Sequence, residues 1–308
     1  MSIKTIAYRL LGSRYTALAY GWRSATTRAW AAFHPYHYDG TRYAGSFLNE
    51  KAAYSYDDSN LQKVERVIYV FWTGDNEITP NRLKGIKSLE KVSGIRVRLV
   101  TPKNLPQYIK AEDPLPEAYK YLSLNHRSDF LRGYFMYHYG GGYADIKTYY
   151  KSWVPAFDKL DGSEAYVIGY PEIGWRGVSN RKINNENLKN DLAINWSLLI
   201  GNGAFICRPH TRFTAEWYST SRRRLEEHSE ILREHPARDF FGTNDDYPLA
   251  WESMQGGIFH PFCLKYHDRL LKDKALMPSF KDYRQVYLRN TMIDTNGLED
   301  GEDGKYER

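Results

Sequence analysis

The sequence is poor in cysteine and has no long apolar run. Cys207 and Cys263 are the only cysteines among 308 residues, and they form neither a CxxC pair nor a zinc-ligand spacing. We therefore expect two buried thiols in a reducing, cytoplasmic setting, with a Cys207–Cys263 disulfide as the alternative. No stretch reaches the roughly 18 consecutive apolar residues that a membrane-spanning helix needs. These absences argue against a disulfide scaffold, a zinc-binding module and a membrane span.

Several functional signatures are also missing. The net charge of +6 suits a protein that meets anions such as diphosphates, acidic glycans, phospholipid surfaces or nucleic acid. The sequence has no clustered basic helix, zinc spacing or RNA-binding aromatic motif, so we expect no nucleic-acid partner. No pair of carboxylates stands out as acid and nucleophile, which argues against a glycoside hydrolase. Charge alone leaves the other anionic partners open.

Composition changes along the chain predict three parts. A chain of 308 residues can bury a sizeable core. Residues 1–63 combine an N-terminal amphipathic helix with a connecting segment of little regular structure. Residues 64–289 carry the strand and helix patterns of an α/β domain. Residues 290–308 are polar, acidic and glycine-bearing, and we expect them to be disordered.

The N-terminal helix admits more than one interpretation. It is basic and bears Trp22 and Trp30, so it could lie in the interface of an anionic membrane, on the inner face of the cell membrane. It could equally pack on the catalytic domain. A Ser/Thr/Arg-rich organellar targeting segment is a third interpretation, whereas the apolar run is too short and interrupted for a good signal peptide.

The start of the α/β domain is the clearest part of the pattern. Residues 66–72 form a β-branched and aromatic run that predicts a buried strand. Pro80 favours a first helical turn and predicts a helix through about residue 92. Residues 95–100 alternate as a second strand. A strand, a helix and a strand with short links form a βαβ unit, which predicts a parallel sheet.

The remaining elements are less regular. Further expected elements are a short element at 105–109, a helix at 126–138, strands at 143–149, 165–170 and 197–208, and a long helix at 210–234 with Arg222 to Arg224 on its solvated side. A polar loop is expected between the strands at 165–170 and 197–208. Residues 239–263 are expected to be rich in loops, with His260 at the end of a short strand.

One segment carries the strongest functional signal. Asp129 and Arg132 lie three residues apart, so on a helix they share one face. Gly140, Gly141 and Gly142 allow a tight turn or a close approach of the backbone. Asp145 then comes at the end of a strand, where α/β sheets tend to place ligand-binding groups. A carboxylate and a guanidinium aimed at a second carboxylate suit a polyanionic, hydroxyl-rich ligand such as a sugar nucleotide.

The whole run, SDFLRGYFMYHYGGGYADIK at residues 128–147, resembles the signature of bacterial capsular polysaccharide synthesis proteins. It is equally similar to sugar transferases related to the yeast initiating α-1,6-mannosyltransferase. The resemblance covers residues 66–150. It implies a GT-A fold, which is a single Rossmann-type mixed sheet flanked by helices, here with an N-terminal helical extension.

The resemblance also implies an activity. Its members are hexosyltransferase-like enzymes that move a sugar from a nucleoside-diphosphate sugar to a glycan or lipid-linked acceptor. The expected setting is synthesis of a surface polysaccharide, a capsule or a lipopolysaccharide. The mannosyltransferase-like relatives retain the anomeric configuration and usually use a divalent cation, Mn²⁺ or Mg²⁺.

The sequence departs from the family pattern at one position. Lys147 stands where many relatives have the second Asp of an Asp-x-Asp motif. A hard cation takes oxygen ligands, and an ammonium group repels it. Either Asp145 holds the metal with donors from elsewhere, or Lys147 itself offsets the charge of the diphosphate. A catalytically inactive nucleotide-sugar-binding or scaffold protein is the alternative function.

The candidate site residues follow from the motif and the resemblance. We expect Asp145, Arg132 and Lys147 to take part in catalysis. The expected donor-binding residues are Trp72, Asp129, Arg132, Gly141, Gly142 and Asn202, the last in a Gly201–Gly203 turn.

Some of these assignments have alternatives. Trp72 could stack on the base of the nucleotide or lie in the core, and Asp75 and Asn76 in the next turn could bind the ribose or the base. The expected metal ligands are Asp145 and His260, with Asp245, Asp246 and His267 as further candidates, although a lone histidine is often only hydrogen-bonded at the surface.

Overall fold

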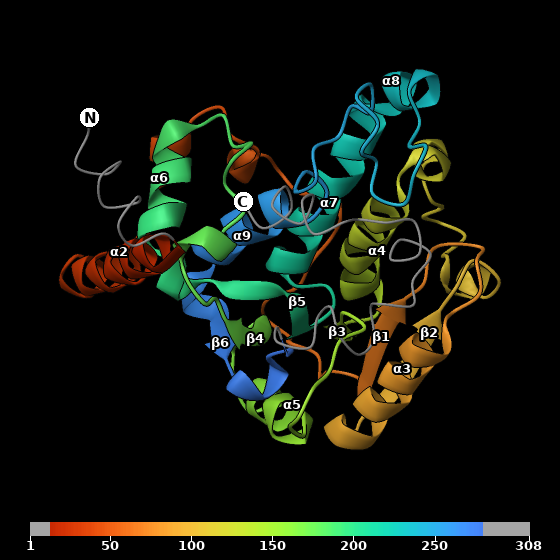
Figure 1. Cartoon of the computed structure of the whole chain (residues 1–308), viewed down its shortest axis with the longest axis horizontal. Helices are drawn as coiled ribbons and strands as arrows, with labels where there is room; N and C mark the ends of the chain where they lie inside the picture. The colour runs from red at the N-terminus through yellow and green to blue at the C-terminus, as the bar shows by residue number, and fades with distance from the viewer. Residues whose placement is uncertain (1–12, 280–308) are drawn as a thin grey trace.

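A single mixed sheet lies at the centre of the molecule, with helices on both faces (Figure 1). The computed structural model of the chain describes residues 13–279, and the side chains from residue 21 onward. The sheet has six strands in the order β2-β1-β3-β5-β4-β6. The strands are β1 (Val67–Phe71), β2 (Arg96–Val100), β3 (Gly141–Ala144), β4 (Val167–Pro171), β5 (Ile200–Cys207) and β6 (Leu270–Lys272). The predicted α/β class with a helix-flanked mixed sheet is confirmed.

The direction of the strands decides where ligand-binding groups can gather. β1 pairs in parallel with both β2 and β3, and β4 pairs in parallel with β6. β5 runs antiparallel to its two neighbours, β3 and β4. All strands except β5 therefore point the same way, and their carboxyl ends share one edge of the sheet with the start of β5.

The expected βαβ unit is present, and its capping follows from the sequence. All five residues of β1 are buried, as a central parallel strand requires. α3 (Pro80–Ser93) begins after Thr79, whose side chain accepts a hydrogen bond from the backbone of Arg82. It ends at Gly94, which adopts the left-handed conformation at φ 70°.

Helices cover the two faces of the sheet with separate apolar cores. α4 (Leu124–His138), α7 (Arg212–Glu227) and α9 (Gly256–Lys265) pack on one face. α3 and α5 (Val154–Asp161) pack on the other. Cys207 and Cys263 are buried free thiols, as expected.

The remaining helices are shorter or peripheral. They are α2 (Ser13–Phe33), α6 (Glu186–Ile194), α8 (Ser229–Glu234) and the 3-10 helices η1 (Gly40–Tyr43), η2 (Phe47–Asn49), η3 (Leu105–Tyr108), η4 (Glu117–Tyr121), η5 (Trp175–Gly177), η6 (Trp196–Leu198), η7 (His267–Arg269) and η8 (Lys274–Leu276). The expected element at 105–109 corresponds to η3.

The N-terminal helix α2 touches the rest of the molecule and also presents aromatic side chains to solvent. The indole N–H of Trp196 donates to the Thr27 hydroxyl at 2.9 Å. Trp22, Trp30 and Phe33 are 75%, 56% and 83% exposed. Within the described range, no helix has both the length and the apolarity needed to cross a membrane.

The ends of the chain limit two of the sequence predictions. Residues 1–12 and the predicted disordered tail at 290–308 lie outside the described residues. The connecting segment contains only the short helices η1 and η2 between residues 35 and 63. Tyr43 and Leu48 from this segment are fully buried in the same core as α4 and α7.

Outside the motif at residues 128–147, three predictions of secondary structure were wrong. α6 lies within the expected polar loop, where Asn185 caps the helix by accepting from the backbone of Leu188. The expected helix at 210–234 is two helices, because the chain turns at His228 between α7 and α8. The region at 239–263 contains the start of α9, a helix with Pro261 in its interior.

The reason for missing α9 is physical. It begins at Gly256 and Gly257, which favour a loop in a sequence, and it contains a proline. Its residues Gly256–Leu264 are all buried, so no polar stripe marks a helical period. His260 is accordingly inside a helix and not at the end of a strand.

Candidate functional site

Residues from separate segments lie along the carboxyl edge of the sheet. Trp72 follows β1, Asp145 follows β3 and Glu172 follows β4. Asn202 lies near the start of β5 at the same edge. This is the position at which open α/β sheets bind ligands.

Asp145 is the centre of this group. Its Oδ1 accepts from the hydroxyl of Tyr143 at 2.8 Å and lies 3.5 Å from Nη2 of Arg132. Its Oδ2 lies 2.9 Å from Nζ of Lys147. Burial raises the pKa of the Asp145 carboxyl, but Lys147 and Arg132 outweigh that effect and hold it below its usual value. The side chain is still 25% exposed, so a ligand can reach the ionised carboxylate.

Arg132 links both carboxylates of the motif. Its Nη2 lies 3.2 Å from Oδ1 of Asp129, and its Nη1 donates to the backbone carbonyl of Asn202 at 3.3 Å. The guanidinium stacks 4.3 Å above the ring of Tyr143. Its Nε is buried and has no hydrogen-bond partner in the described residues. The contact between Asp129 and Arg132 confirms the prediction that the two side chains share one face of the helix.

Asp129 differs from Asp145 in its titration. Its side chain is almost fully buried and accepts from Nδ2 of Asn125 at 3.3 Å. Burial outweighs the attraction of Arg132 and raises the pKa of Asp129 to about 7. Two neighbouring carboxylates thus have pKa values pushed in opposite directions, which is common at functional sites.

The predicted strand at 143–149 was wrong, although Lys147 does lie beside Asp145. β3 covers Gly141–Ala144 and ends before Asp145. The backbone then bends, and the N–H of Lys147 donates to the carbonyl of Asp145 at 2.8 Å. This local turn, and not the alternation of side chains along a strand, brings the ammonium to the carboxylate.

The turn after β1 lies close to the start of α4. The hydroxyl of Thr73 donates to the carbonyl of Leu124 at 2.6 Å. Trp72 is half-buried, and its indole N–H donates to the carbonyl of Asn76 at 2.8 Å. Asp75 in the same turn is exposed. The ring of Trp72 is therefore held by its own turn, at the edge of the core under α3.

The glycines of the motif act in packing. Gly140 and Gly141 adopt positive φ values of 64° and 87°, so the predicted glycine turn is present at the other end of β3 from Asp145. A Cβ on Gly141 would lie 2.9 Å from a methyl group of Val67, and one on Gly142 would lie 3.1 Å from Ile68. Gly141 and Gly142 let β1 and β3 pack closely, and both are buried inside the sheet.

Asn202 lies within β5 and not in a turn, which corrects the sequence interpretation. The flanking glycines leave room for the site. A Cβ on Gly201 would overlap the ring of Tyr170, and one on Gly203 would lie 2.9 Å from Oδ2 of Asp145. Gly203 thereby allows the carboxylate of Asp145 to lie directly over β5.

The late histidines and aspartates have other partners. Nδ1 of His260 accepts from the backbone N–H of Ser179 at 3.0 Å, and its ring is fully buried. Asp246 pairs with Arg238 and with His235. Asp245 is exposed, and Nδ1 of His267 bonds to the carbonyl of Leu264 at 3.1 Å.

Glu172 is a site residue that sequence reasoning missed. Its Oε1 accepts from the backbone N–H of Ile173 at 2.7 Å, and its Oε2 lies 3.7 Å from Nε2 of His260. Burial raises the pKa of the Glu172 carboxyl to about 7. The available signal was its position directly after the apolar strand β4, because carboxyl ends of parallel strands carry ligand-binding groups.

The donor set does not fit a divalent cation as it is arranged. Such a cation needs several oxygen ligands. Both oxygens of Asp145 already face the cations Arg132 and Lys147. Within residues 21–279, no three His, Cys, Asp or Glu side chains gather in a way that could hold a metal ion. Metal dependence stays a prediction.

Comparison with known proteins places the motif in a family context. No curated protein and no solved structure matches the chain. The matched family segment begins in η1, includes Asp129, Arg132, Asp145 and Glu172, and ends in α6. Residues 42–192 match the family of capsular polysaccharide synthesis proteins, and this match indicates a biosynthetic enzyme with a part in making capsular polysaccharide.

Proposed function

We propose that the chain is a glycosyltransferase of the GT-A type. It transfers a sugar from a nucleoside-diphosphate sugar to a glycan or lipid-linked acceptor during capsule synthesis. The observation that carries this proposal is Asp145 at the carboxyl edge of the sheet, reachable from solvent and held between Arg132 and Lys147. A carboxylate there can accept hydrogen bonds from sugar hydroxyls, while the two cations meet phosphate oxygens.

Charge development on the leaving group explains the two cations. As the bond between the anomeric carbon and the phosphate oxygen breaks, negative charge grows on the diphosphate. Groups that are already oriented toward that charge lower the barrier without reorganising during the reaction. Arg132 is fixed by Asp129, Asn202 and Tyr143, and is therefore already oriented. Lys147 supplies the charge that a divalent cation supplies in many relatives.

Variants at Lys147 test this role. Lys147→Ala should slow transfer without creating metal dependence, because the charge on the leaving group is then less well stabilised. Lys147→Asp should make transfer depend on Mn²⁺, because it restores a second carboxylate. Initial rates with and without Mn²⁺ measure both effects. Rates and metal responses equal to those of the unaltered enzyme in both variants would show that Lys147 does not serve the diphosphate.

The stereochemical course depends on where the proton of the acceptor goes. In transfer with retention, which we propose, the departing phosphate oxygen accepts that proton as the acceptor oxygen bonds to the anomeric carbon. An inverting enzyme needs a protein base instead. Glu172, with a pKa raised to about 7 by burial, is a group at this edge that could serve. Product analysis by NMR distinguishes retention from inversion. The variant Glu172→Gln is a second test, because only inversion through Glu172 predicts complete loss of transfer.

The donor itself can be identified by its effect on stability. We expect one of UDP-, GDP- or dTDP-sugars to raise the melting temperature of the full chain. A ligand far above its dissociation constant stabilises the fold by a few kcal/mol. Asp145→Ala should reduce that shift. A panel in which no nucleotide sugar shifts the melting temperature would contradict the proposed function.

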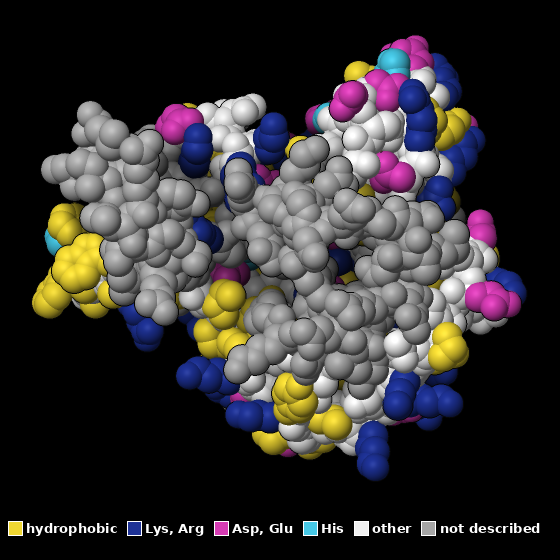
Figure 2. Space-filling view, in the orientation of Figure 1, with side chains coloured by type: hydrophobic (Ala, Val, Ile, Leu, Met, Phe, Trp, Pro, Cys, Tyr) yellow, Lys and Arg dark blue, Asp and Glu magenta, His cyan; other side chains and the backbone are white. Residues whose placement is uncertain are grey.

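A peripheral position on the inner face of the membrane is part of the proposal. Trp22, Trp30 and Phe33 lie on one side of α2 and are exposed. Figure 2 shows hydrophobic side chains gathered at this end of the molecule. Aromatic side chains favour the membrane interface. Replacing all three by serine should reduce co-sedimentation with anionic vesicles, and unchanged binding would leave α2 with a packing role only.

A further inference from the structure

Three consecutive arginines on α7 have different surroundings. Arg222 pairs with Asp113 and Glu226, and Arg223 pairs with Glu50 and Glu227. Within the described residues no carboxylate lies within ion-pair distance of Arg224; its guanidinium donates to the carbonyl of Ser253. The prediction that all three form a solvated side of the helix was therefore wrong. Arg224 points into a cavity instead.

The cavity is large enough for a saccharide unit. Its volume is about 340 Å³, near the lower end of the range of small-molecule sites. It lies between η2, the start of α6, the end of α7 and the start of α9. Figure 2 shows Lys and Arg side chains on the α6 side of the notch between α6 and α8, and Asp or Glu side chains on its α8 side.

The walls of the cavity combine positive charge with apolar surface. Lys182 lines it beside Arg224, and the part of the chain that the structure describes places no carboxylate within ion-pair distance of Lys182. Glu252 is the acidic residue of the wall, and its Oε1 accepts from the backbone N–H of Lys182 at 3.2 Å. Phe47 and Leu249 add apolar surface.

The surroundings of Arg224 suit an anionic ligand. Its guanidinium lies 5.4 Å from the centroid of the Phe47 ring. Burial lowers the pKa of Arg224 to about 10, which reflects a cation held away from water without a carboxylate in contact. The residue is partly buried, and a cation withdrawn from water is costly to retain unless a partner compensates it. A carboxylate from a ligand would provide a bidentate partner for the guanidinium.

A chain of neighbouring residues connects the cavity with the proposed donor site. Gly257 belongs to its wall. A Cβ on the preceding residue, Gly256, would lie 3.2 Å from Nδ2 of Asn202. The carbonyl of Asn202 accepts from Arg132, which contacts Asp145. The first turn of α9 therefore separates the cavity from the carboxyl edge of the sheet.

We propose that this cavity binds an acidic sugar residue of the glycan acceptor. Arg224 and Lys182 hold its carboxylate, and Phe47 and Leu249 contact the sugar ring. The idea rests on the proposed transferase function, for which it names the acceptor class. It predicts that the enzyme extends uronate-containing chains in preference to neutral ones.

Binding measurements on the full chain test the cavity independently of catalysis. The probes are a tetrasaccharide with alternating glucuronate residues, its carboxyl-reduced neutral counterpart and inorganic phosphate, each measured by calorimetry. We expect the acidic tetrasaccharide to bind at least ten-fold more tightly than the neutral one. Equal affinity for the acidic and the neutral tetrasaccharide would overturn the proposal. So would displacement of the acidic tetrasaccharide by an equal concentration of phosphate.

Matched variants locate the binding. Arg224→Gln and Lys182→Gln should each weaken binding of the acidic tetrasaccharide about ten-fold, whereas Arg223→Gln should not, because Arg223 pairs with Glu50 and Glu227 outside the cavity. Equal losses in Arg223→Gln and Arg224→Gln would also overturn it. The melting-temperature shift caused by the nucleotide sugar should be the same in all three variants. If no nucleotide sugar shifts the melting temperature of the unaltered chain, the transferase function is refuted. If only saccharide binding fails, the proposed role of the cavity alone is refuted.

Discussion

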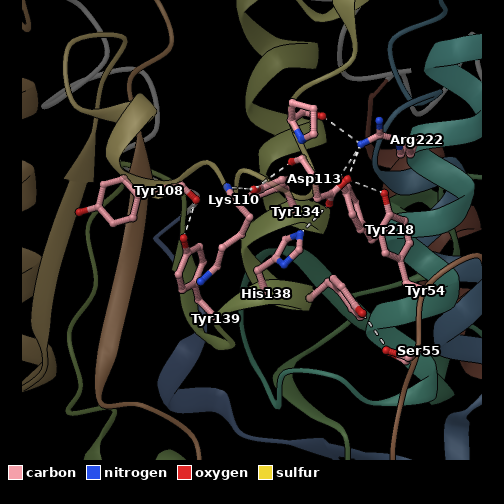
Figure 3. A network of polar contacts seen from close by, with 12 residues as sticks. Tyr54, Ser55, Tyr108, Lys110, Asp113, Tyr134, His138, Tyr139, Tyr218 and Arg222 are labelled. Atoms are coloured by element: carbon pink, nitrogen blue, oxygen red, sulfur yellow. Dashed lines mark hydrogen bonds and ion pairs between the residues drawn. The ribbon is translucent and has the colours of Figure 1, made fainter.

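Two carboxylates beside α4, those of Asp113 and Asp145, differ in their hydrogen-bond partners and in their exposure to solvent. Near the end of α4, Asp113 accepts from Tyr54 at 2.8 Å, Tyr218 at 2.7 Å and Arg222 at 2.5 Å, and bonds to His138 at 2.7 Å (Figure 3). Its side chain is 8% exposed. Near the start of α4, Asp145 is 25% exposed.

The difference separates a structural carboxylate from a ligand-binding one. The partners of Asp113 come from α4, α7 and the segment before β1, so this carboxylate joins parts that are distant in sequence. The partners of Asp145 come from its own strand and loop and from α4. Breaking the Asp113 cluster should cost stability, and breaking the Asp145 cluster should cost activity.

The largest expected effect is on transfer. Asp145→Ala should lower kcat at least 100-fold, in line with the loss of one oriented group in an active site. Its unfolding free energy should change by less than about 2 kcal/mol, because Lys147 can reach solvent once its partner is gone. Initial rates and urea unfolding measure the two quantities. A rate near that of the unaltered enzyme would refute the site assignment.

The converse substitution should act on the fold. Asp113→Ala leaves Arg222 and the hydroxyl groups of Tyr54 and Tyr218 without their acceptor, and removing one partner of a buried ion pair costs about 3–5 kcal/mol. Below the unfolding transition, kcat per folded molecule should stay unchanged. Urea unfolding checks the first statement, and a large loss of kcat in folded protein would erase the contrast between the two clusters.

The two clusters should respond to pH with opposite signs. The pKa of Asp129 is raised to about 7 in the folded state, so the folded state binds more protons than the unfolded one between about pH 4 and 7. That contribution to stability is fully present at low pH and is lost as pH rises through about 7. Between pH 4.5 and 8, the unfolding free energy of the unaltered chain, measured in urea, should fall by on the order of 1–3 kcal/mol relative to that of Asp129→Asn. A difference between the two unfolding free energies that stays constant with pH would contradict this prediction.

His138 in the Asp113 cluster gives the opposite dependence. Burial lowers the pKa of His138 despite its bond to Asp113. The unfolded state therefore binds more protons near and below the usual histidine pKa, and the stability contributed by this group falls as pH falls through that range. Unfolding of His138→Asn from pH 8 to 5 should be less sensitive to acid than that of the unaltered chain. Equal acid sensitivity would assign the effect elsewhere.

A pair of glycines gives the smallest and most local test. Gly203→Ala would place a Cβ 2.9 Å from Oδ2 of Asp145 and should lower kcat about ten-fold by displacing the carboxylate. Gly133→Ala, on α4 between the clusters, meets nothing closer than 3.6 Å. It should leave kcat unchanged and stabilise the helix by about 0.5–1 kcal/mol. Similar rates in both variants would show that the position of Asp145 tolerates displacement.

Local patterns were enough to find the first half of the site. Asp129, Arg132, Asp145 and Lys147 fall within residues 128–147, and the structure brings them into contact. Their spacing along one helix and one turn fixes their proximity, so a sequence can reveal it. The capping residue Thr79 and the breaking residue Gly94 likewise fixed the limits of α3.

The rest of the site required the tertiary fold. Asn202 comes close to Asp145 only because β5 pairs with β3, and Glu172 shares the same edge because β4 pairs with β5. These are long-range pairings that no local pattern encodes. His260 looked like a possible ligand, but the buried helix α9 directs its Nδ1 to Ser179. Burial on all sides removed the periodic signal by which α9 could have been recognised.

The sequence by itself determined the α/β class, the βαβ start and the motif around Asp145, because hydrophobic period, caps and turns act over a few residues. Only the tertiary structure decided that Arg222 and Arg223 meet carboxylates while Arg224 faces a cavity. It also decided that the pKa of Asp129 is raised whereas the pKa of Asp145 is lowered. Both depend on which distant groups exclude water from a charge, and that is a property of packing.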